Sequence, residues 1–233
     1  MNKVKTSQLN NRLLSLDILR GITIAGMILV NNSGAGSYTY APLKHAQWHG
    51  LTPTDLVFPF FMFIMGISTF MSLRKFNFEP SKAAVWKIIR RTILIFAIGL
   101  ALGWFGKFTS GLSQGESILV AATHFDTLRI LGVLQRLALA YGFAALLAVI
   151  FKSKYIPWII AALLVGYQLL LKLGNGYEMM EQNIIAIVDK AIWGVEHMYK
   201  YWTPGGERIA FDPEGLLSTI PSIAHVLIGF LFG

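Results

Sequence analysis

The chain has 233 residues, of which 55% are hydrophobic and 14% are charged, and its mean hydropathy is +0.57. Soluble domains carry about 25% charged residues, so this composition excludes an ordinary soluble globule and an intrinsically disordered chain. The formal net charge of +8 does not indicate nucleic-acid binding, because the basic residues are divided among short segments between apolar runs. The chain contains no cysteine, which excludes disulfides, thiolate nucleophiles and cysteine metal sites.

Six apolar runs follow one another along the chain, and together they hold nearly half of its residues. Each run is close to the roughly 17–25 residues that a helix needs to cross a bilayer. The runs are continuously apolar and do not alternate as the strands of a membrane barrel do. The sequence therefore predicts an all-α fold, a polytopic transmembrane helical bundle. The six expected spans are residues 13–30, 55–73, 88–105, 130–151, 156–171 and 216–233.

The distribution of lysine and arginine predicts the orientation of the bundle. With the N-terminus in the cytoplasm, the inner segments 1–12, 74–87 and 152–155, together with Arg90 and Arg91, carry eleven basic residues, whereas the much longer outer segments carry seven. Basic residues concentrate in cytoplasmic loops, so we expect a cytoplasmic N-terminus. The short inner segment 152–155 predicts that the fourth and fifth spans form an antiparallel hairpin.

Polar chemistry concentrates in the outer segments 31–54, 106–129 and 172–215, which hold nine of the twelve acidic residues and four of the five histidines. The longest of them, 172–215, is a long extracytoplasmic loop with an expected helix near 178–200. We interpret residues 1–233 as one transmembrane domain. Its last apolar run stops at residue 233 without a charged anchor, so we expect the chain to be the N-terminal part of a longer catalytic region.

Charged residues inside the first span have two interpretations. Asp17 and Arg20 are three residues apart and share a helix face. They either neutralise one another within the bundle, or Arg20 meets an anionic ligand that enters from the inner side.

Gln135 and Arg136 lie about one to two turns into the fourth span, where neither side chain belongs next to lipid. Arg136 must therefore face the bundle, and its planar guanidinium suits a carboxylate or a phosphate. An internal ion pair with Asp17 or Asp55 is the structural alternative.

Two histidines lie close to the start of the second span. His45 and His49 are four residues apart, and Asp55 follows at the same membrane face, where it could orient an imidazole. A zinc site needs three or four ligands, so we expect no metal here. Acid–base or nucleophilic chemistry is the better interpretation, and Asn31, at the end of the first span, could donate an amide hydrogen bond to a developing oxyanion.

Four segments in the same order resemble the catalytic region of heparan-α-glucosaminide N-acetyltransferase and its bacterial relatives. They are RLLSLDILRG (12–21), KHAQWHGLTPTDLVFP (44–59) continuing to FIMG (63–66), GVLQRL (132–137) and DPEGL (212–216). The resemblance implies a multi-span acetyltransferase that takes its acetyl group from cytosolic acetyl-CoA and delivers it to an amino sugar across the membrane. It also implies that the catalytic histidine is His45, assisted by Asn31.

From these observations we expect His45, Asn31 and Asp55 to be catalytic. We expect Arg20, Gln135 and Arg136 to hold acetyl-CoA. The acceptor, an amino sugar or related glycan, is then expected at three further residues, His49, Asp212 and Glu214.

The expected partners are acetyl-CoA, the acceptor, the lipid bilayer and, in a homodimer, a second copy, with no nucleic acid. The absence of cysteine favours a bacterial cytoplasmic (inner) membrane. The alternative function is a transporter or channel for a small polar or anionic solute, because Asp17, Arg20 and Arg136 would suit such a path. The sequence shows neither inverted repeats nor paired broken helices, which counts against a transporter.

Overall fold

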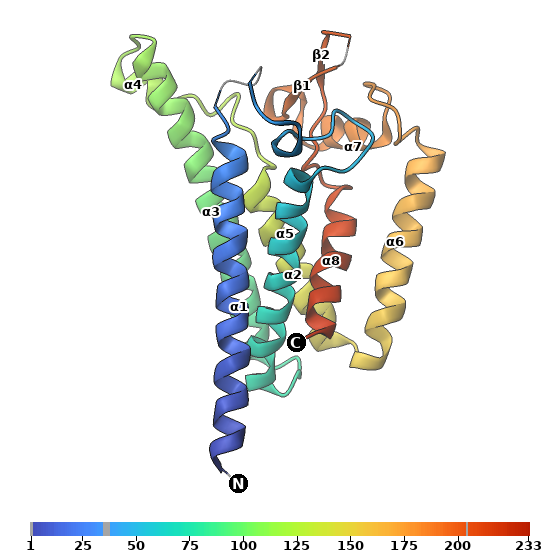
Figure 1. Cartoon of the computed structure of the whole chain (residues 1–233). Helices are drawn as coiled ribbons and strands as arrows, with labels where there is room; N and C mark the ends of the chain where they lie inside the picture. The colour runs from blue at the N-terminus through green and yellow to red at the C-terminus, as the bar shows by residue number, and fades with distance from the viewer. Residues whose placement is uncertain (1, 35–37, 204) are drawn as a thin grey trace.

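The computed structural model describes residues 2–34, 38–203 and 205–233, with side chains from residue 14 onward, and is built of long helices with one small β-hairpin (Figure 1). This confirms the predicted all-α membrane bundle. The helices are α1 (Asn2–Asn31), α2 (Pro53–Leu73), α3 (Lys82–Ser113), α4 (Ile118–Ala122), α5 (Val133–Ile150), α6 (Ile156–Leu173), α7 (Ile184–Trp193) and α8 (Thr219–Leu231). The strands are β1 (Lys200–Trp202) and β2 (Arg208–Ala210).

Within the part of the chain that the structure describes, five helices are long and apolar enough to cross a membrane, namely α1, α2, α3, α5 and α6. They correspond to the first five predicted spans. The sixth predicted span contains α8, whose 13 residues make a helix of about 20 Å, shorter than the roughly 30 Å hydrocarbon core of a bilayer. The count of six spans and the cytoplasmic N-terminus stay predictions.

Local sequence signals set where α2 begins. Thr52 and Asp55 form a capping box. The Thr52 side chain accepts a hydrogen bond from the backbone N–H of Asp55, and the Asp55 side chain accepts one from the backbone N–H of Thr52. Pro53 occupies the first turn, where its missing N–H costs nothing. These signals place the Asp55 carboxylate at the end of α2 that lies opposite the N-terminus of the chain.

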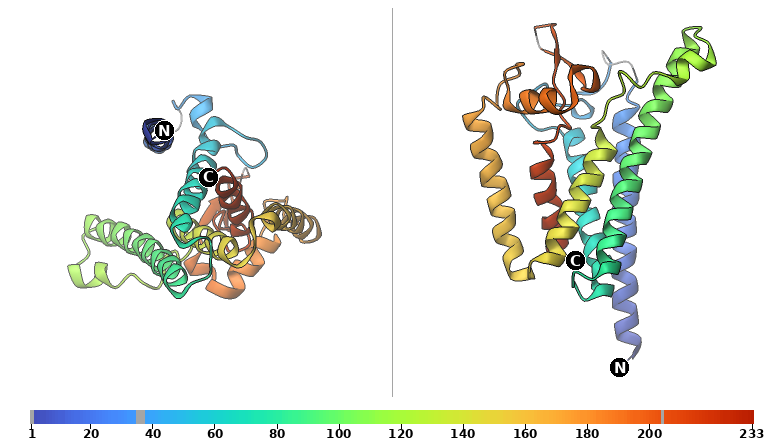
Figure 2. Two further views of the ribbon diagram at one scale, coloured as in Figure 1. Left: turned by 90° about the horizontal axis from the view of Figure 1, so that it is seen from below. Right: turned by 180° about the vertical axis from the view of Figure 1, so that it is seen from behind.

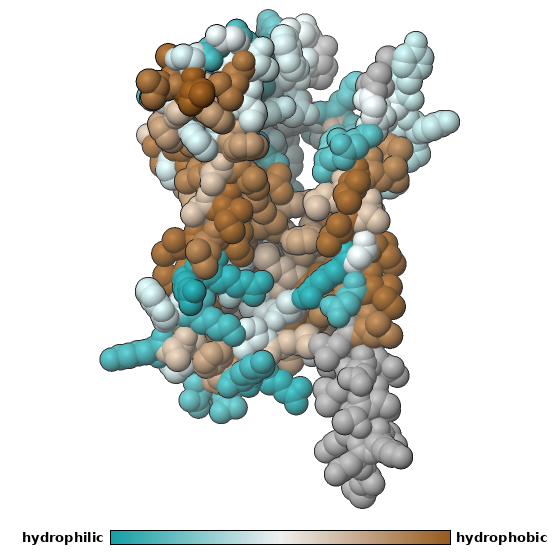
Figure 3. Space-filling model, turned by 90° about the vertical axis from the view of Figure 1, so that its left-hand side faces the viewer, coloured by the Kyte–Doolittle hydropathy of each residue, from teal (hydrophilic) through white to brown (hydrophobic). Residues whose placement is uncertain are grey.

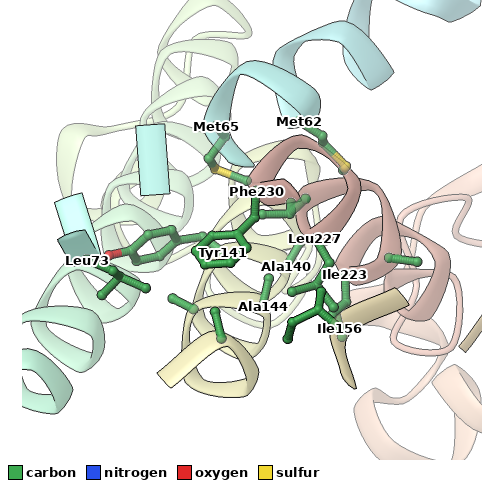
Figure 4. Close-up of a cluster of buried hydrophobic side chains, with 14 of the residues drawn as sticks. Met62, Met65, Leu73, Ala140, Tyr141, Ala144, Ile156, Ile223, Leu227 and Phe230 are labelled. Atoms are coloured by element: carbon green, nitrogen blue, oxygen red, sulfur yellow. The ribbon is translucent and has the colours of Figure 1, made fainter. Parts of the chain in front are cut away.

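The core of the bundle lies where α2, α5 and α8 meet. Figure 4 shows Met62 and Met65 of α2 beside Leu227 and Phe230 of α8, with Tyr141 of α5 completing the cluster. Alanine recurs along α5, and small residues let membrane helices approach closely. The fully or nearly fully buried alanines of α5 are Ala138, Ala140, Ala144, Ala145 and Ala148.

Helix α8 lies between α5 and α6 and contacts both (Figures 1 and 2). The fourth and fifth spans are antiparallel and joined by a short turn, as predicted, but α8 separates them above that turn. Helix α3 packs along α5, and α1 packs against α2 on the other side of the bundle. The chain segment after residue 216 is therefore central to the bundle, not peripheral.

Helices α1, α3 and α6 turn most of their apolar side chains outward, as lipid-facing spans do. Figure 3 shows apolar side chains over the middle of one face and hydrophilic side chains gathered below them. The basic residues Lys82, Lys87, Arg90 and Arg91 are exposed at this lower end of α3.

A layer of loops covers the end of the bundle opposite the N-terminus (Figure 1). It contains α7, within the helix predicted near 178–200, and the antiparallel hairpin of β1 and β2, in which Tyr201 pairs with Ile209. Ile185, Ala186, Ile209 and Phe211 form a small second core in this layer. The hairpin was not among the predicted elements.

Candidate active site

His45 and Asp55 form a hydrogen-bonded pair at the loop-covered end of α2. Nδ1 of His45 lies 2.6 Å from Oδ1 of Asp55, and the His45 side chain is 70% exposed. A carboxylate bound to Nδ1 favours the neutral tautomer with its proton on Nδ1. Nε2 then carries a free lone pair, which can accept a proton or attack a carbonyl carbon.

The Asp55 carboxylate is fixed by its neighbours. Oδ2 accepts hydrogen bonds from the backbone N–H of Thr52 (2.8 Å), from its hydroxyl (2.8 Å) and from the N–H of Ala46 (3.3 Å). An ionised carboxylate is the form that accepts this many hydrogen bonds. The first turn of α2 therefore fixes the carboxylate that holds the His45 imidazole in place.

A pocket of about 630 Å³ opens beside this pair. Small-molecule sites usually measure about 300–1,000 Å³, so the volume suits a sugar-sized ligand. Residues from four separate parts of the chain meet here. The lining residues are His45, Ala46, Asp55, Arg129, Tyr199, Tyr201, Trp202, Pro213 and Glu214.

Arg129 connects the turn after β2, which contains Asp212 and Glu214, to the pocket. Its Nε and Nη2 donate to the two carboxylate oxygens of Asp212 (2.8 and 2.5 Å), and Nη2 also donates to Glu214. Burial alone would lower the pKa of Arg129, but the hydrogen bonds and charges of Asp212 and Glu214 raise it above its ordinary value. Asp212 is 2% exposed and therefore acts within the protein, whereas Glu214 reaches the pocket.

Arg136 binds the start of α8. Its guanidinium donates to the hydroxyl of Ser222 (2.7 Å) and to the backbone carbonyls of Ser218 (2.7 Å) and Pro213 (3.3 Å). It also lies over the ring of Phe58, 5.5 Å from the ring centre. The two acids proposed as its ion-pair partners are bonded elsewhere, Asp17 to Arg20 and Asp55 to His45.

Asp189 of α7 supports the same turn from its other side. It is 1% exposed, and its Oδ1 accepts from the N–H of Leu216 (2.9 Å), while Oδ2 has no hydrogen-bond partner among the described residues. Burial, opposed by the Leu216 hydrogen bond and reinforced by the charge of Asp212, raises the pKa of Asp189 to about 6. A Cβ atom on Gly215 would lie 1.8 Å from Oδ2, so a larger residue there would require the Asp189 side chain to move.

Two hydrogen bonds join the histidine segment to the loop layer. Trp48 donates from its indole nitrogen to the carbonyl of Tyr177 (2.6 Å), and the Tyr201 hydroxyl donates to the carbonyl of Gln47 (3.2 Å). The rings of Trp48 and Tyr201 both meet Phe211 edge-on. The position of His45 thus depends on residues more than 120 positions later in the chain.

Other predicted site residues lie outside the pocket lining. Asn31 is the exposed last residue of α1. His49 is exposed beside Trp48, with their ring centres 6.4 Å apart. Arg20 bonds Asp17 at 3.3 Å and the Ser68 hydroxyl, which joins α1 to α2.

Gln135 is buried between α3 and α5. A Cβ atom on Gly99 would lie 2.7 Å from its side-chain amide, so Gln135 fills the space that glycine leaves.

The remaining histidines have other surroundings. Nε2 of His124 lies 2.6 Å from Glu116, which makes a second histidine–carboxylate pair near α4. Nδ1 of His197 lies 2.7 Å from the carbonyl of Leu128, and His225 is partly buried in α8. Of the two histidine–carboxylate pairs among the described residues, the His45 pair lies in the pocket that Arg129 and Glu214 also line.

Sequence reasoning did not single out Arg129, Asp189 or the aromatic residues of β1. A short stretch of alternating side-chain type followed by the Pro-Gly-Gly run at 204–206 is typical of a β-hairpin. This pattern could have identified the strand β1. Arg129 and Asp189 carry no such local signal, since their partners Asp212 and Leu216 are 83 and 27 residues away.

Comparison with known proteins identifies the family of the chain. The family model for the catalytic region of heparan-alpha-glucosaminide N-acetyltransferase matches residues 12–188. The human protein named heparan-alpha-glucosaminide N-acetyltransferase is 30% identical over 98% of this chain, and the mouse protein of that name is 29% identical over 96%. The chain spans about two fifths of the length of these relatives, 39% in each case. The matched region includes the segment that holds His45 and Asp55, and the chain belongs to the heparan-alpha-glucosaminide N-acetyltransferase catalytic family.

Proposed function

We propose that this protein is a transmembrane acetyltransferase that moves an acetyl group from acetyl-CoA to the amine of an amino sugar on the extracytoplasmic side. The observation that carries the proposal is the His45–Asp55 pair at 2.6 Å, exposed in a pocket beside the Arg129–Glu214 pair. Membership of an N-acetyltransferase family supports the reaction type. We place this end of the bundle outside a bacterial cytoplasmic membrane, on the basic residues at the opposite end.

The reaction needs one group that handles a proton. The amine nitrogen attacks the thioester carbonyl carbon, and Nε2 of His45 accepts the proton that the nitrogen loses. The C–S bond then breaks, and the same proton passes to the sulfur, which leaves as the thiol of CoA. In the covalent alternative, Nε2 attacks the carbonyl carbon first, the C–S bond breaks and CoA leaves as the thiolate. The amine then attacks the acetyl carbon, the bond from that carbon to Nε2 breaks, and the proton that the amine loses protonates the thiolate. Both routes give an amide and a thiol, and in both Asp55 stabilises the positive charge on the imidazole.

Acetyl-CoA is a substrate that carries several phosphate charges, so it needs cations near the inner side. Arg90 and Arg91 are exposed at that end of α3 and supply such charges. A mainly apolar groove of about 440 Å³ runs between α1 and α2 beside Arg20 and suits the acyl-bearing arm. It is lined by Ser15, Leu16, Ile18, Leu19, Ile22, Ile67, Met71 and Phe232.

We assign the polar residues around the pocket to separate roles. Glu214 reaches the pocket and suits an ammonium or hydroxyl group of the acceptor, while Asp212 holds Arg129 in place. Asn31 and His49 lie at the same end of the bundle, and we retain them as an oxyanion donor and an acceptor contact. Arg136 acts through the packing of α5 and α8, and Gln135 acts through the packing of α3 and α5.

The deciding experiment is acetyl transfer by the purified protein in lipid nanodiscs, with radiolabelled acetyl-CoA and a panel of amino sugars and alcohols. We expect labelled amide with amino sugars and release of CoA in equal amount. Binding of acetyl-CoA without transfer to any acceptor, or transport of a solute without acylation, would overturn the proposal.

A further inference from the structure

We propose that Trp202 and Tyr199, at the β1 strand, form a stacking subsite for the sugar ring of the acceptor. The inference rests on the proposed function and adds the part of the protein that selects a ring-shaped acceptor. A pyranose ring has an apolar face of C–H groups and a rim of hydroxyls. Aromatic faces bury such an apolar surface, and carboxylates bind the rim.

The exposure of these side chains is the first observation. Trp202 is 63% exposed and Tyr199 is 43% exposed, although both line the pocket that holds His45. Large aromatic side chains gain most from burial, so their exposure within a pocket indicates a surface that a ligand covers. Figure 1 places β1 above the ends of α2 and α8, away from the lipid-facing helices.

Two arginines lie over the rings of Tyr199 and Trp202, and one of them, Arg129, also lines the pocket. The Arg129 guanidinium lies over the Tyr199 ring at 4.9 Å, and that of Arg208 lies over the Trp202 ring at 5.8 Å. A cation over one face of an aromatic ring holds the ring in place. The subsite is therefore organised before a ligand arrives, which lowers the entropy lost on binding.

Tyr201 has a different role. Its hydroxyl is bonded to the carbonyl of Gln47, and its ring meets Phe211 edge-on with centres 6.5 Å apart. These contacts make Tyr201 a positioning residue that ties the strand to the segment of His45. Glu214 and Asp55 complete the pocket with the carboxylates that hydroxyl and ammonium groups need. Aromatic faces beside carboxylates, at the proposed proton acceptor, match an amino sugar better than a flexible alkyl amine.

The test compares a closed ring with an open chain of similar polarity. Methyl glucosaminide has a locked pyranose ring, whereas glucamine carries an amine and hydroxyls on an acyclic chain. In the intact protein we expect Trp202→Ala to lower kcat/KM for methyl glucosaminide relative to glucamine about tenfold, as for the loss of one aromatic contact. Trp202→Phe should restore most of this ratio. Trp86→Ala is the matched control, because Trp86 is 65% exposed at the far end of α3.

Saccharide binding without acetyl-CoA separates this inference from the proposed function. Saturation-transfer NMR should show methyl glucosaminide bound by the wild-type protein and by Trp86→Ala, and weakened by Trp202→Ala. Binding that depends on Trp202 without acetyl transfer would reject the proposed function and keep the subsite. Acetyl transfer with the same ring-to-chain ratio in wild type and Trp202→Ala would reject the subsite and keep the function. Absence of both binding and transfer would reject both.

Discussion

Gly66 of α2 lies directly against Gly229 of α8, and neither position has space for a side chain. A Cβ atom on Gly66 would lie 2.8 Å from Cα of Gly229 and 2.1 Å from the carbonyl oxygen of Val226. A Cβ atom on Gly229 would lie 2.1 Å from the carbonyl oxygen of Phe63. The two backbones therefore touch at this crossing, as small residues allow in membrane helices.

Gly66→Ala should accordingly destabilise the bundle by about 1–3 kcal/mol or more, because backbone atoms and not flexible side chains oppose the new methyl group. Thermal unfolding in detergent, followed by size-exclusion chromatography after heating, measures the effect. Gly21→Ala in α1 is the control, since nothing lies within 4 Å of its Cβ position. Equal melting temperatures for the two variants would contradict the close crossing of α2 and α8.

Replacement of His45 tests the proposed chemistry. His45→Ala should lower acetyl transfer by about 10²–10⁴-fold, the usual contribution of a general acid or base, while acetyl-CoA binding persists. Asp55→Asn should lower it by a smaller factor, because Nε2 remains in place but loses its oriented partner. Measurement of initial rates at saturating donor gives both numbers.

His124→Ala provides a demanding control for that experiment. His124 forms the same kind of pair with Glu116, also at 2.6 Å, but does not line the pocket. The His124→Ala variant should transfer acetyl groups at the wild-type rate, and His49→Ala should retain measurable turnover. Loss of activity in His124→Ala with wild-type activity in His45→Ala would move the active site to the end of α3.

Arg129 should matter for stability as well as for the pocket. Arg129→Leu removes the partner of a carboxylate that is 2% exposed, and breaking such a buried pair costs roughly 3 kcal/mol. Lys200→Leu breaks an exposed pair with Glu196 and should cost under about 1 kcal/mol. The melting temperatures of both variants test this difference. A small loss in Arg129→Leu would mean that water reaches Asp212.

The buried Asp189 predicts a pH dependence of stability. Its pKa is raised from 3.8 to about 6, so the folded state holds the proton more tightly than the unfolded state does. This contribution to stability is complete below about pH 4 and is lost as the pH rises through 6. Asp189→Asn keeps an acceptor for the Leu216 N–H but cannot ionise. The melting temperature of the wild type should therefore fall relative to that of Asp189→Asn between pH 4.5 and pH 7.5. Parallel curves would show that Asp189 does not titrate in this range.

Introduced cysteines test the orientation without background labelling, since the chain contains none. Gln114→Cys lies just after α3 at the pocket end, and Glu79→Cys lies before α3 at the opposite end. Both positions are exposed. In intact cells an impermeant maleimide should label Gln114→Cys and should label Glu79→Cys only after lysis. The reverse pattern would place the pocket in the cytoplasm.

The spans were predictable because their signal is local. Long apolar runs bounded by polar segments give α1, α2, α3, α5 and α6, and Thr52, Pro53 and Asp55 mark the start of α2. The same reasoning predicted the approach of Asp55 to His45, because the two are only ten residues apart. Contacts between distant segments were not predictable in this way. Arg136 was expected to meet an acid or a phosphate, but it binds carbonyl groups and a hydroxyl at the start of α8.

The residues that form hydrogen bonds with Arg136 are synthesised long after Arg136 itself. Ser222 follows it by 86 residues, which at a synthesis rate of about 5–20 residues per second corresponds to roughly 4–17 s. During this interval α5 carries a guanidinium without its final partners, at a cost of roughly 2.5–3.5 kcal/mol if it enters the membrane interior. Arg136 lies in the first turn of α5, so its side chain can remain in the aqueous interface until α8 is synthesised. Placement of α8 between α5 and α6 then supplies these partners and fixes the turn that carries Glu214, so the pocket is assembled only after α8 has been synthesised.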